Sequence, residues 1–383
     1  MAKKTKGQDL AEKLTWSAPN IGKEAPKQTS KANKFCEGYK QFLNEAKTER
    51  ECVTAIVYRL SKAGYRPYDK HAVYHPGDKV YYVNRKKSVI ATTFGAEPLE
   101  AGLRLNGAHI DSPRLDLKPN PLYEKDDMAL FKTHYYGGIR KYQWTAIPLA
   151  IHGVVVKKNG EIVNVVIGED EKDPVFCVTD LLPHLAAKQN ERKLGDGIRG
   201  EELNVVIGSL PYQDEAVKEP VKLLALQLLY EKYGMTEADF YRAEIEIVPA
   251  FKAVDVGLDR SMVGAYGQDD RVCAYTALMA EIEMETPTYT TVTIFADKEE
   301  IGSDGNTGLN SDFVLHYVED LAEQAGADIR TVLRSSLCLS SDVNAAYDPT
   351  FADVYEPKNA SYINRGCVLT KYTGARGKSG SND

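Results

Sequence analysis

The chain has 383 residues, of which 43% are apolar and 27% are charged, and its formal net charge at pH 7 is −7. This length and apolar content allow a large buried core and favour two domains over one. The negative net charge provides no basic field for nucleic acid, and no apolar run approaches the length that spans a membrane. We therefore expect no nucleic-acid partner and no membrane partner.

The cysteines and the beginning of the chain indicate a compartment. Six cysteines occur without Cys-x-x-Cys spacing, so free thiols in a reducing environment are the simplest interpretation. No apolar segment that could act as a signal peptide follows the short basic start of the chain. The sequence therefore predicts a cytoplasmic protein.

Helices and then strands are predicted in the first third of the chain. Residues 31–65 have the pattern of two helices, and residues 78–93 have the pattern of a β-hairpin. Residues 102–110 alternate apolar and polar side chains as a strand does. A strand here would end near His109, and Asp111, two residues further on, would face the same side.

The middle of the chain has a different pattern. Residues 151–168 contain Asn159-Gly160, a strong signal for a tight hairpin turn. A long helix is predicted from about residue 216 to 233, followed by a strand within residues 242–251. Beyond that strand the alternation of strands and helices resumes, so residues 120–249 read as an insertion into a domain formed by the two ends of the chain.

Four short polar motifs occur at or near the ends of predicted strands. They are NGAHIDSPR at 106–114, GQDDRV at 267–272, DKEEIG at 297–302 and SSDVN at 340–344. Open α/β sheets bind ligands beyond the carboxyl ends of their strands, and this set of acidic and histidine side chains would be hard to bury unpaired. Oxygen and imidazole ligands are those that hydrolytic Zn²⁺, Mn²⁺ or Co²⁺ ions require. Together the motifs predict a metal site.

Each motif on its own is a weak signal, because ordinary local structure explains it as well as a metal site does, or better. The first could be a polar turn before Pro113, the second a helix cap, the third a solvated turn, and the fourth a cap or turn. Only their combination favours a metal site.

In order and approximate spacing, the HIDSPR, Asp-Asp, DKEEIGS and SSD motifs closely resemble those of the M18 family of metalloaminopeptidases, the aspartyl aminopeptidase group of the co-catalytic zinc peptidase clan. The resemblance runs from about residue 30 to the end of the chain. It implies an α/β fold: a mixed-sheet zinc-peptidase catalytic domain with helices on both faces, plus an inserted β-rich dimerisation domain. The catalytic domain would comprise residues 1–119 and 250–383, and the dimerisation domain residues 120–249.

The resemblance also implies a ligand set for two divalent metal ions, most readily Zn²⁺, with Co²⁺ or Mn²⁺ as alternatives. Asp269 would bridge the two ions, His109 and Asp342 would complete the site of one, and Glu300 would bind the other. The family has a cis peptide bond after the bridging aspartate, which here is the bond between Asp269 and Asp270.

Catalytic roles follow from the same resemblance. Glu299 would be the general base that accepts a proton from the metal-activated water, and Asp111 would fix the His109 imidazole from behind. The segment IPLAIHG at 147–153 is similar to the family segment whose histidine reaches into the neighbouring subunit's active site, which implies that role for His152. The alternative there is an ordinary histidine on a strand.

The implied function is removal of N-terminal residues from peptides with a free N-terminus. The implied assembly is a homo-oligomer built from dimers and then dodecamers. The same ligands would also serve a carboxypeptidase or deacylase of the clan, and a non-catalytic assembly protein could keep the fold without the chemistry. Activity on free-amine peptides compared with N-acylated peptides separates the enzyme classes.

One ligand of the family has no counterpart in this sequence. The family supplies a further histidine to the metal held by Glu300, from a segment near its C-terminus. The last histidine here is His316, within a predicted amphipathic helix at 311–324. We therefore expect a C-terminally truncated chain, with a short family member that holds water in that position as the alternative.

Overall fold

The computed structural model of the protein describes residues 4–374 and 379–382. It divides into two compact units, one within Met1–Gly38 and Val343–Asp383 and the other at Tyr39–Asp342. The helices in chain order are α1 (Lys6–Leu14), α2 (Ile21–Glu24), α3 (Pro26–Glu45), α4 (Glu49–Lys62), α5 (Ala187–Asn190), α6 (Pro220–Tyr233), α7 (Gln268–Glu283), α8 (Phe313–Ala325) and α9 (Ile329–Ser335). The two helices predicted at 31–65 are confirmed as α3 and α4. α3 begins earlier than expected, at Pro26, because proline suits the first turn of a helix.

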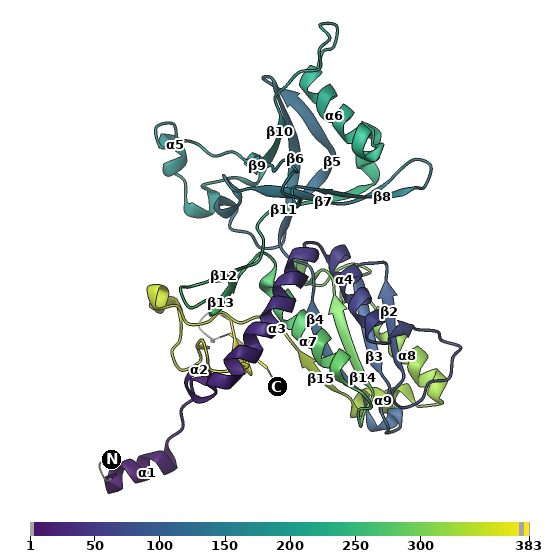
Figure 1. Ribbon diagram of the computed structural model, residues 1–383, viewed down its shortest axis with the longest axis vertical. Helices are drawn as coiled ribbons and strands as arrows, with labels where there is room; N and C mark the ends of the chain where they lie inside the picture. The colour runs from purple at the N-terminus through teal and green to yellow at the C-terminus, as the bar shows by residue number, and fades with distance from the viewer. Residues whose placement is uncertain (1–3, 375–378, 383) are drawn as a thin grey trace. The chain divides into compact units, whose positions relative to one another are not determined.

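The larger unit contains a six-stranded sheet whose strands lead into the polar motifs (Figure 1). Its order is β1 (Arg66–Pro67), β2 (Lys79–Asn84), β3 (Ser88–Thr93), β14 (Thr291–Ala296), β4 (Arg104–His109) and β15 (Leu337–Ser340). β14, β4 and β15 run parallel to one another, whereas β3 pairs antiparallel with β14. The sheet is therefore mixed, as expected. The hairpin predicted at 78–93 is confirmed as β2 and β3.

Helices cover both faces of this sheet (Figure 1), because successive side chains of a strand point to opposite faces. Val89 and Ala91 of β3 pack in one core with α3, α4 and α7, while Ile90 between them packs in another with α8 and α9. In β14, Phe295 belongs to the first core and Ile294 to the second. The expected arrangement of helices on both faces is confirmed.

A seven-stranded sheet occupies the middle of the chain. Its order is β8 (Ile162–Ile167), β7 (Leu149–Val156), β11 (Ala243–Pro249), β5 (Arg114–Lys125), β6 (Met128–Tyr136), β10 (Asn204–Gly208) and β9 (Cys177–Val178). β7 and β8 form the hairpin predicted around Asn159-Gly160. Helix α6 packs on the core of this sheet. It begins at Pro220 rather than near residue 216, because Glu219 before the proline is held out of the helical conformation.

Shorter elements complete the description. β12 (Val254–Val256) pairs with β13 (Met262–Gly264), and β16 (Tyr372–Thr373) pairs with β17 (Gly380–Ser381). All six cysteines are free thiols. Within residues 4–374 and 379–382, no helix combines the length and the apolar character that a membrane crossing needs.

Candidate metal centre

Three parallel strands bring three of the polar motifs to one edge of the six-stranded sheet. The last residue of β14 lies opposite His109, the last residue of β4. Glu299 and Glu300 follow β14 in a short 3-10 turn. On the other side of β4, β15 ends two residues before Asp342. The carboxyl ends of these strands therefore gather one histidine and three carboxylates.

The fourth motif joins this group from the start of α7. Asp269 and Asp270 have non-helical backbone angles and are joined by a cis peptide bond, as the resemblance implied. Asp269 Oδ1 lies 3.0 Å from His109 Nε2, and Ser112 Oγ donates a hydrogen bond to the Asp269 carbonyl at 2.8 Å. The preceding strand, β13, belongs to a small two-stranded sheet rather than to the six-stranded one.

Two groups of possible metal-ligand atoms result, and both contain His109. Within each group the ligand atoms all lie within 4.8 Å of one another. One group is His109, Asp270 and Asp342, and the other is His109, Asp269 and Glu300. All four ligands proposed from the sequence are therefore found here. Asp270, to which sequence reasoning assigned no ligand role, accompanies them.

The charges of this cluster fit a divalent cation. Asp270 is completely buried, and apart from the Cys273 thiol its carboxylate has no hydrogen-bond partner among the described residues. Burial raises the pKa of Asp270 to about 7, and burial together with the nearby Asp269 raises the pKa of Glu300 to about 7. Ionised carboxylates held this close repel one another. A cation between them would remove the repulsion and satisfy the buried oxygens.

His109 is the one imidazole of both groups, and it is only 3% exposed. Burial alone would lower its pKa, but hydrogen bonds to Asp111 and Asp269 raise the pKa to about 11. Without a cation, the imidazole therefore carries a proton at neutral pH. A metal ion that binds here must displace this proton, because a ligating histidine is neutral.

Asp111 holds three parts of the site together. Its Oδ1 lies 3.3 Å from His109 Nδ1 and accepts the backbone N–H of Glu299 at 3.1 Å. Its Oδ2 accepts the backbone N–H of Glu300 at 3.2 Å and the hydroxyl of Tyr136 at 2.6 Å. Although burial alone would raise the pKa of this carboxyl, its hydrogen bonds hold the pKa below the ordinary value. Asp111 is therefore ionised, and it orients both the imidazole and the glutamate turn.

The seven-stranded sheet reaches the site through the end of β6. Tyr136 is the last residue of β6, and a Cβ on the next residue, Gly137, would lie 3.2 Å from Glu300 Cβ. Gly137 has a φ of +74°, so a side chain there would be strained as well as crowded. Sequence reasoning missed Tyr136. The only signal was the segment THYYGGIRKYQW at 133–144, whose aromatics and glycines also fit a hairpin or a subunit contact.

Two further histidines singled out from the sequence, His152 and His316, are not in either ligand group. His152 is buried in β7, where its Nδ1 lies 2.7 Å from Glu51 Oε1 and its Nε2 lies 3.1 Å from Glu169 Oε1. Burial opposes protonation of this imidazole, but the two carboxylates raise its pKa. Both ring nitrogens are thus engaged within the same chain, and a role in a neighbouring subunit remains a proposal. His316 is exposed on α8, the helix that was predicted at 311–324.

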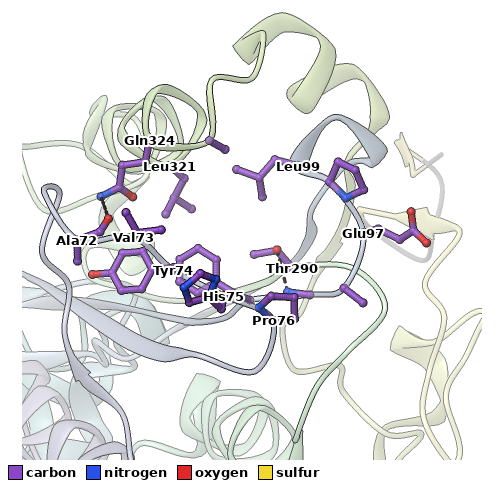
Figure 2. Close-up of a pocket in the computed structure, with 15 residues that line it drawn as sticks. Ala72, Val73, Tyr74, His75, Pro76, Glu97, Leu99, Thr290, Leu321 and Gln324 are labelled. Carbon is purple, nitrogen blue, oxygen red and sulfur yellow. Dashed lines mark hydrogen bonds between the residues drawn. The ribbon is translucent and has the colours of Figure 1, made fainter.

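The cavity in Figure 2 lies at the other end of the same sheet. Tyr74, Leu99 and Leu321 contribute to its wall. Thr290, which immediately precedes β14, also lines it, whereas Glu299 follows β14. The cavity is therefore at the amino end of this strand and the ligand cluster is at the carboxyl end. None of the candidate ligands lines the cavity.

A mixed β-sheet with helices on both faces, whose parallel strands end in imidazole and carboxylate side chains, is the architecture of a zinc-peptidase type of hydrolase. A sequence profile of the family described as aminopeptidase I zinc metalloprotease (M18) matches residues 42–383. The chain belongs to this M18 family of metal-dependent aminopeptidases, and the resemblance seen in the sequence is confirmed.

Relatives at high identity support the same family. The chain is 52% identical over 353 residues to a probable M18 family aminopeptidase 1 from Clostridium acetobutylicum. The matched region covers 90% of this chain and 76% of the relative. The crystal structure of the M18-family aminopeptidase from Thermotoga maritima matches with a TM-score of 0.91 and 45% identity, over 96% of this chain and 82% of that one. The structure of aminopeptidase I from Clostridium acetobutylicum gives a TM-score of 0.89 and 49% identity, over 97% and 82% respectively.

Proposed function

We propose that the chain removes single residues from the free N-terminus of peptides, with two divalent metal ions held at the strand ends of the six-stranded sheet. The observation that carries this proposal is the convergence of His109 with carboxylates from three other segments, with ligand atoms within 4.8 Å of one another in each group. Zn²⁺ is the favoured ion, since imidazole and carboxylate groups are its ligands in hydrolytic sites. Co²⁺ or Mn²⁺ would fit the same donors.

In the proposed ligand set, Asp269 bridges the two ions, His109 and Asp342 bind one, and Glu300 binds the other. What supports a bridging role is that the Asp269 carboxylate lies 3.0 Å from His109 Nε2, a proposed ligand of the first ion, and groups with Glu300, the proposed ligand of the second. The buried Asp270 carboxylate supports the first ion, because its ligand atom groups with those of His109 and Asp342.

Glu299 is the proposed general base. Its side chain is 46% exposed, and its Oε2 lies 3.7 Å from His109 Nε2, so it can reach both the cluster and solvent. Burial raises the pKa of Glu299, which makes its carboxylate a better proton acceptor. When bound, the ions would activate a water molecule and polarise the scissile carbonyl. Glu299 would accept the proton of that water and return it to the leaving amine, while Asp111 keeps His109 in place.

We also propose a homo-oligomer in which residues 120–249 form dimers that assemble further into dodecamers, with His152 contributing to the site of the neighbouring subunit. Because Glu51 and Glu169 engage both nitrogens of His152, that contribution would require at least one of these contacts to be exchanged on assembly. Light scattering tests the assembly, and a protein found only as monomers would contradict it. The free thiols support a reducing, cytoplasmic location.

The experiment that tests the proposed activity compares two matched substrates. The protein is saturated in turn with Zn²⁺, Co²⁺ and Mn²⁺, and hydrolysis is measured on aminoacyl anilides with a free amine and on the same compounds with an acetylated amine. An aminopeptidase hydrolyses only the free-amine series. Hydrolysis of the acetylated series would indicate a deacylase-like specificity. Loss of residues from the C-terminus of a test peptide would indicate a carboxypeptidase, and metal binding without any hydrolysis would indicate a non-catalytic protein.

A further inference from the structure

A buried arginine lies beside the ligand cluster and takes no part in the proposed chemistry. Arg271 is on the first turns of α7 and is only 1% exposed. Its Nε and Nη2 donate hydrogen bonds to the Ile110 carbonyl at 3.3 and 3.2 Å. Nη2 also donates to the Lys47 carbonyl at 3.0 Å, and Nε lies 3.1 Å from Cys52 Sγ. The guanidinium therefore contacts neutral acceptors in three separate segments.

These contacts join two segments that carry proposed metal ligands. Ile110 lies between His109, a ligand, and Asp111, which holds that ligand. Arg271 directly follows Asp269 and Asp270. The two hydrogen bonds to the Ile110 carbonyl thus tie the end of β4, which carries the imidazole, to the start of α7, which carries two carboxylates.

A need for packing alone does not explain a charged side chain at this position. Burying a cation without a carboxylate partner is costly, and an apolar residue of similar volume is usually at least as stable. No carboxylate in the described part of the chain forms an ion pair with Arg271, and its Nη1 has no hydrogen-bond partner there. The fixed fork of donors is what distinguishes arginine from lysine or methionine.

The chain also leaves room for this guanidinium. A Cβ at Gly267 would overlap Arg271 Nη1, and Gly267 has a φ of +78°, which L side chains rarely adopt. The Tyr266 ring lies 5.5 Å from the guanidinium carbon. The turn before α7 is therefore shaped around the arginine on one side and around the ligand-bearing aspartates on the other.

We propose that Arg271 is a positioning residue that sets the separation between the His109 ligand and the Asp269 and Asp270 ligands. This inference rests on the proposed metal site. Arg271 is not among the candidate ligands, and it acts by holding the Ile110 carbonyl. Loss of its hydrogen-bonding fork should loosen the site and weaken metal binding by about 10–100-fold, the range seen when residues that orient metal ligands are replaced.

The test compares Arg271→Lys and Arg271→Met with the original protein. The dissociation constant for Zn²⁺ is measured by competition with a chromophoric chelator, and the visible spectrum is recorded after loading with Co²⁺. Both variants should bind Zn²⁺ about 10–100-fold more weakly and show an altered Co²⁺ spectrum, since lysine keeps the charge but not the fork. Arg192→Met, which removes an arginine paired with Glu202 at 2.9 Å, is the matched control and should leave both readouts unchanged.

The possible outcomes separate this inference from the function it rests on. Folded Arg271 variants with unchanged Zn²⁺ affinity and Co²⁺ spectrum would overturn the positioning role while leaving the metal site intact. If the original protein binds no divalent ion, the proposed function fails first, and the inference fails with it.

If both Arg271 variants fail to fold, Cys52→Ala takes their place, with Cys177→Ala in β9 as the control. Cys52→Ala removes the thiol that contacts Arg271 Nε at 3.1 Å and donates to the carbonyls of Ile110 and Ala46 at 3.7 and 3.6 Å. A several-fold loss of Zn²⁺ affinity in Cys52→Ala alone supports the role. Equal affinity in the two cysteine variants contradicts it.

Discussion

Replacement of Asp111 by asparagine, which has nearly the same side-chain shape, should lower the stability of the protein and weaken its binding of Zn²⁺. Each oxygen of this carboxylate faces two groups: Oδ1 faces His109 Nδ1 and the Glu299 amide, and Oδ2 faces the Tyr136 hydroxyl and the Glu300 amide. An asparagine must turn its NH₂ group toward one of these pairs. The less harmful orientation is toward Tyr136, because the hydroxyl can rotate and accept.

Even in that orientation the N–H of Glu300 loses its acceptor. A buried donor without a partner costs about 1–3 kcal/mol, so we expect Asp111→Asn to lower the free energy of unfolding by about that amount. The imidazole also loses a charged neighbour, which should weaken Zn²⁺ binding by about 10–100-fold. Denaturant unfolding of the chelator-treated protein measures the first effect, and chelator competition measures the second.

A matched control for Asp111→Asn is Asp328→Asn. Asp328 caps α9 by accepting the N–H of Thr331 at 3.0 Å, and asparagine caps helices equally well. This control should leave both stability and Zn²⁺ affinity close to those of the original protein. If Asp111→Asn behaves like the control, Asp111 does not organise the site in the way its contacts indicate.

Four further changes test separate parts of the proposed centre. Glu299→Gln should reduce turnover by at least about 10²–10⁴-fold with metal content nearly unchanged, and a near-original rate would remove Glu299 as the base. Asp269→Asn should lose metal in elemental analysis, and unchanged stoichiometry would count against a bridging role. His152→Ala should lower the rate without loss of metal. Mixing it with Glu299→Gln subunits should restore some activity only if sites are shared between subunits. Glu300 and Asp270 have pKa values raised to about 7 in the fold, so the folded state binds their protons more tightly than the unfolded state does. The chelator-treated protein should therefore lose stability as pH rises from about 4 to 7, and thermal unfolding that showed a gain over this range would contradict the assigned shifts.

The sequence was sufficient to predict the sheet and to single out four of the proposed ligands, because these features have local signals. A run rich in β-branched residues marks β14 as a strand. The DKEEIG motif follows this strand directly, so the parallel pairing of β14 with β4 brings Glu300 to His109. Asp270 was missed as a ligand candidate because two adjacent aspartates before a helix look alike in sequence. Only the burial of the second carboxylate distinguishes them.

Long-range contacts explain what the sequence could not reveal. Tyr136 comes from the other sheet and Arg271 contacts Lys47, more than 200 residues earlier in the chain. Neither residue belongs to a ligand-like pattern, and each gains its place only when distant segments meet. The contact of His152 Nδ1 with Glu51, 101 residues earlier in the chain, could likewise not be read from the segment that singled out His152.

The most direct test of the proposed metal centre is the metal content of the protein with His109→Ala. His109 is the only imidazole in the two ligand groups of the described residues, and in the proposed set it binds the ion that shares Asp269 with the other, so its loss should release the first ion and weaken the second. Equilibrium dialysis against Zn²⁺, followed by elemental analysis and an aminoacyl anilide assay, should find bound metal and hydrolysis in the original chain, and less bound metal and no hydrolysis in the variant. Unchanged metal content and unchanged hydrolysis in His109→Ala would show that the centre lies elsewhere.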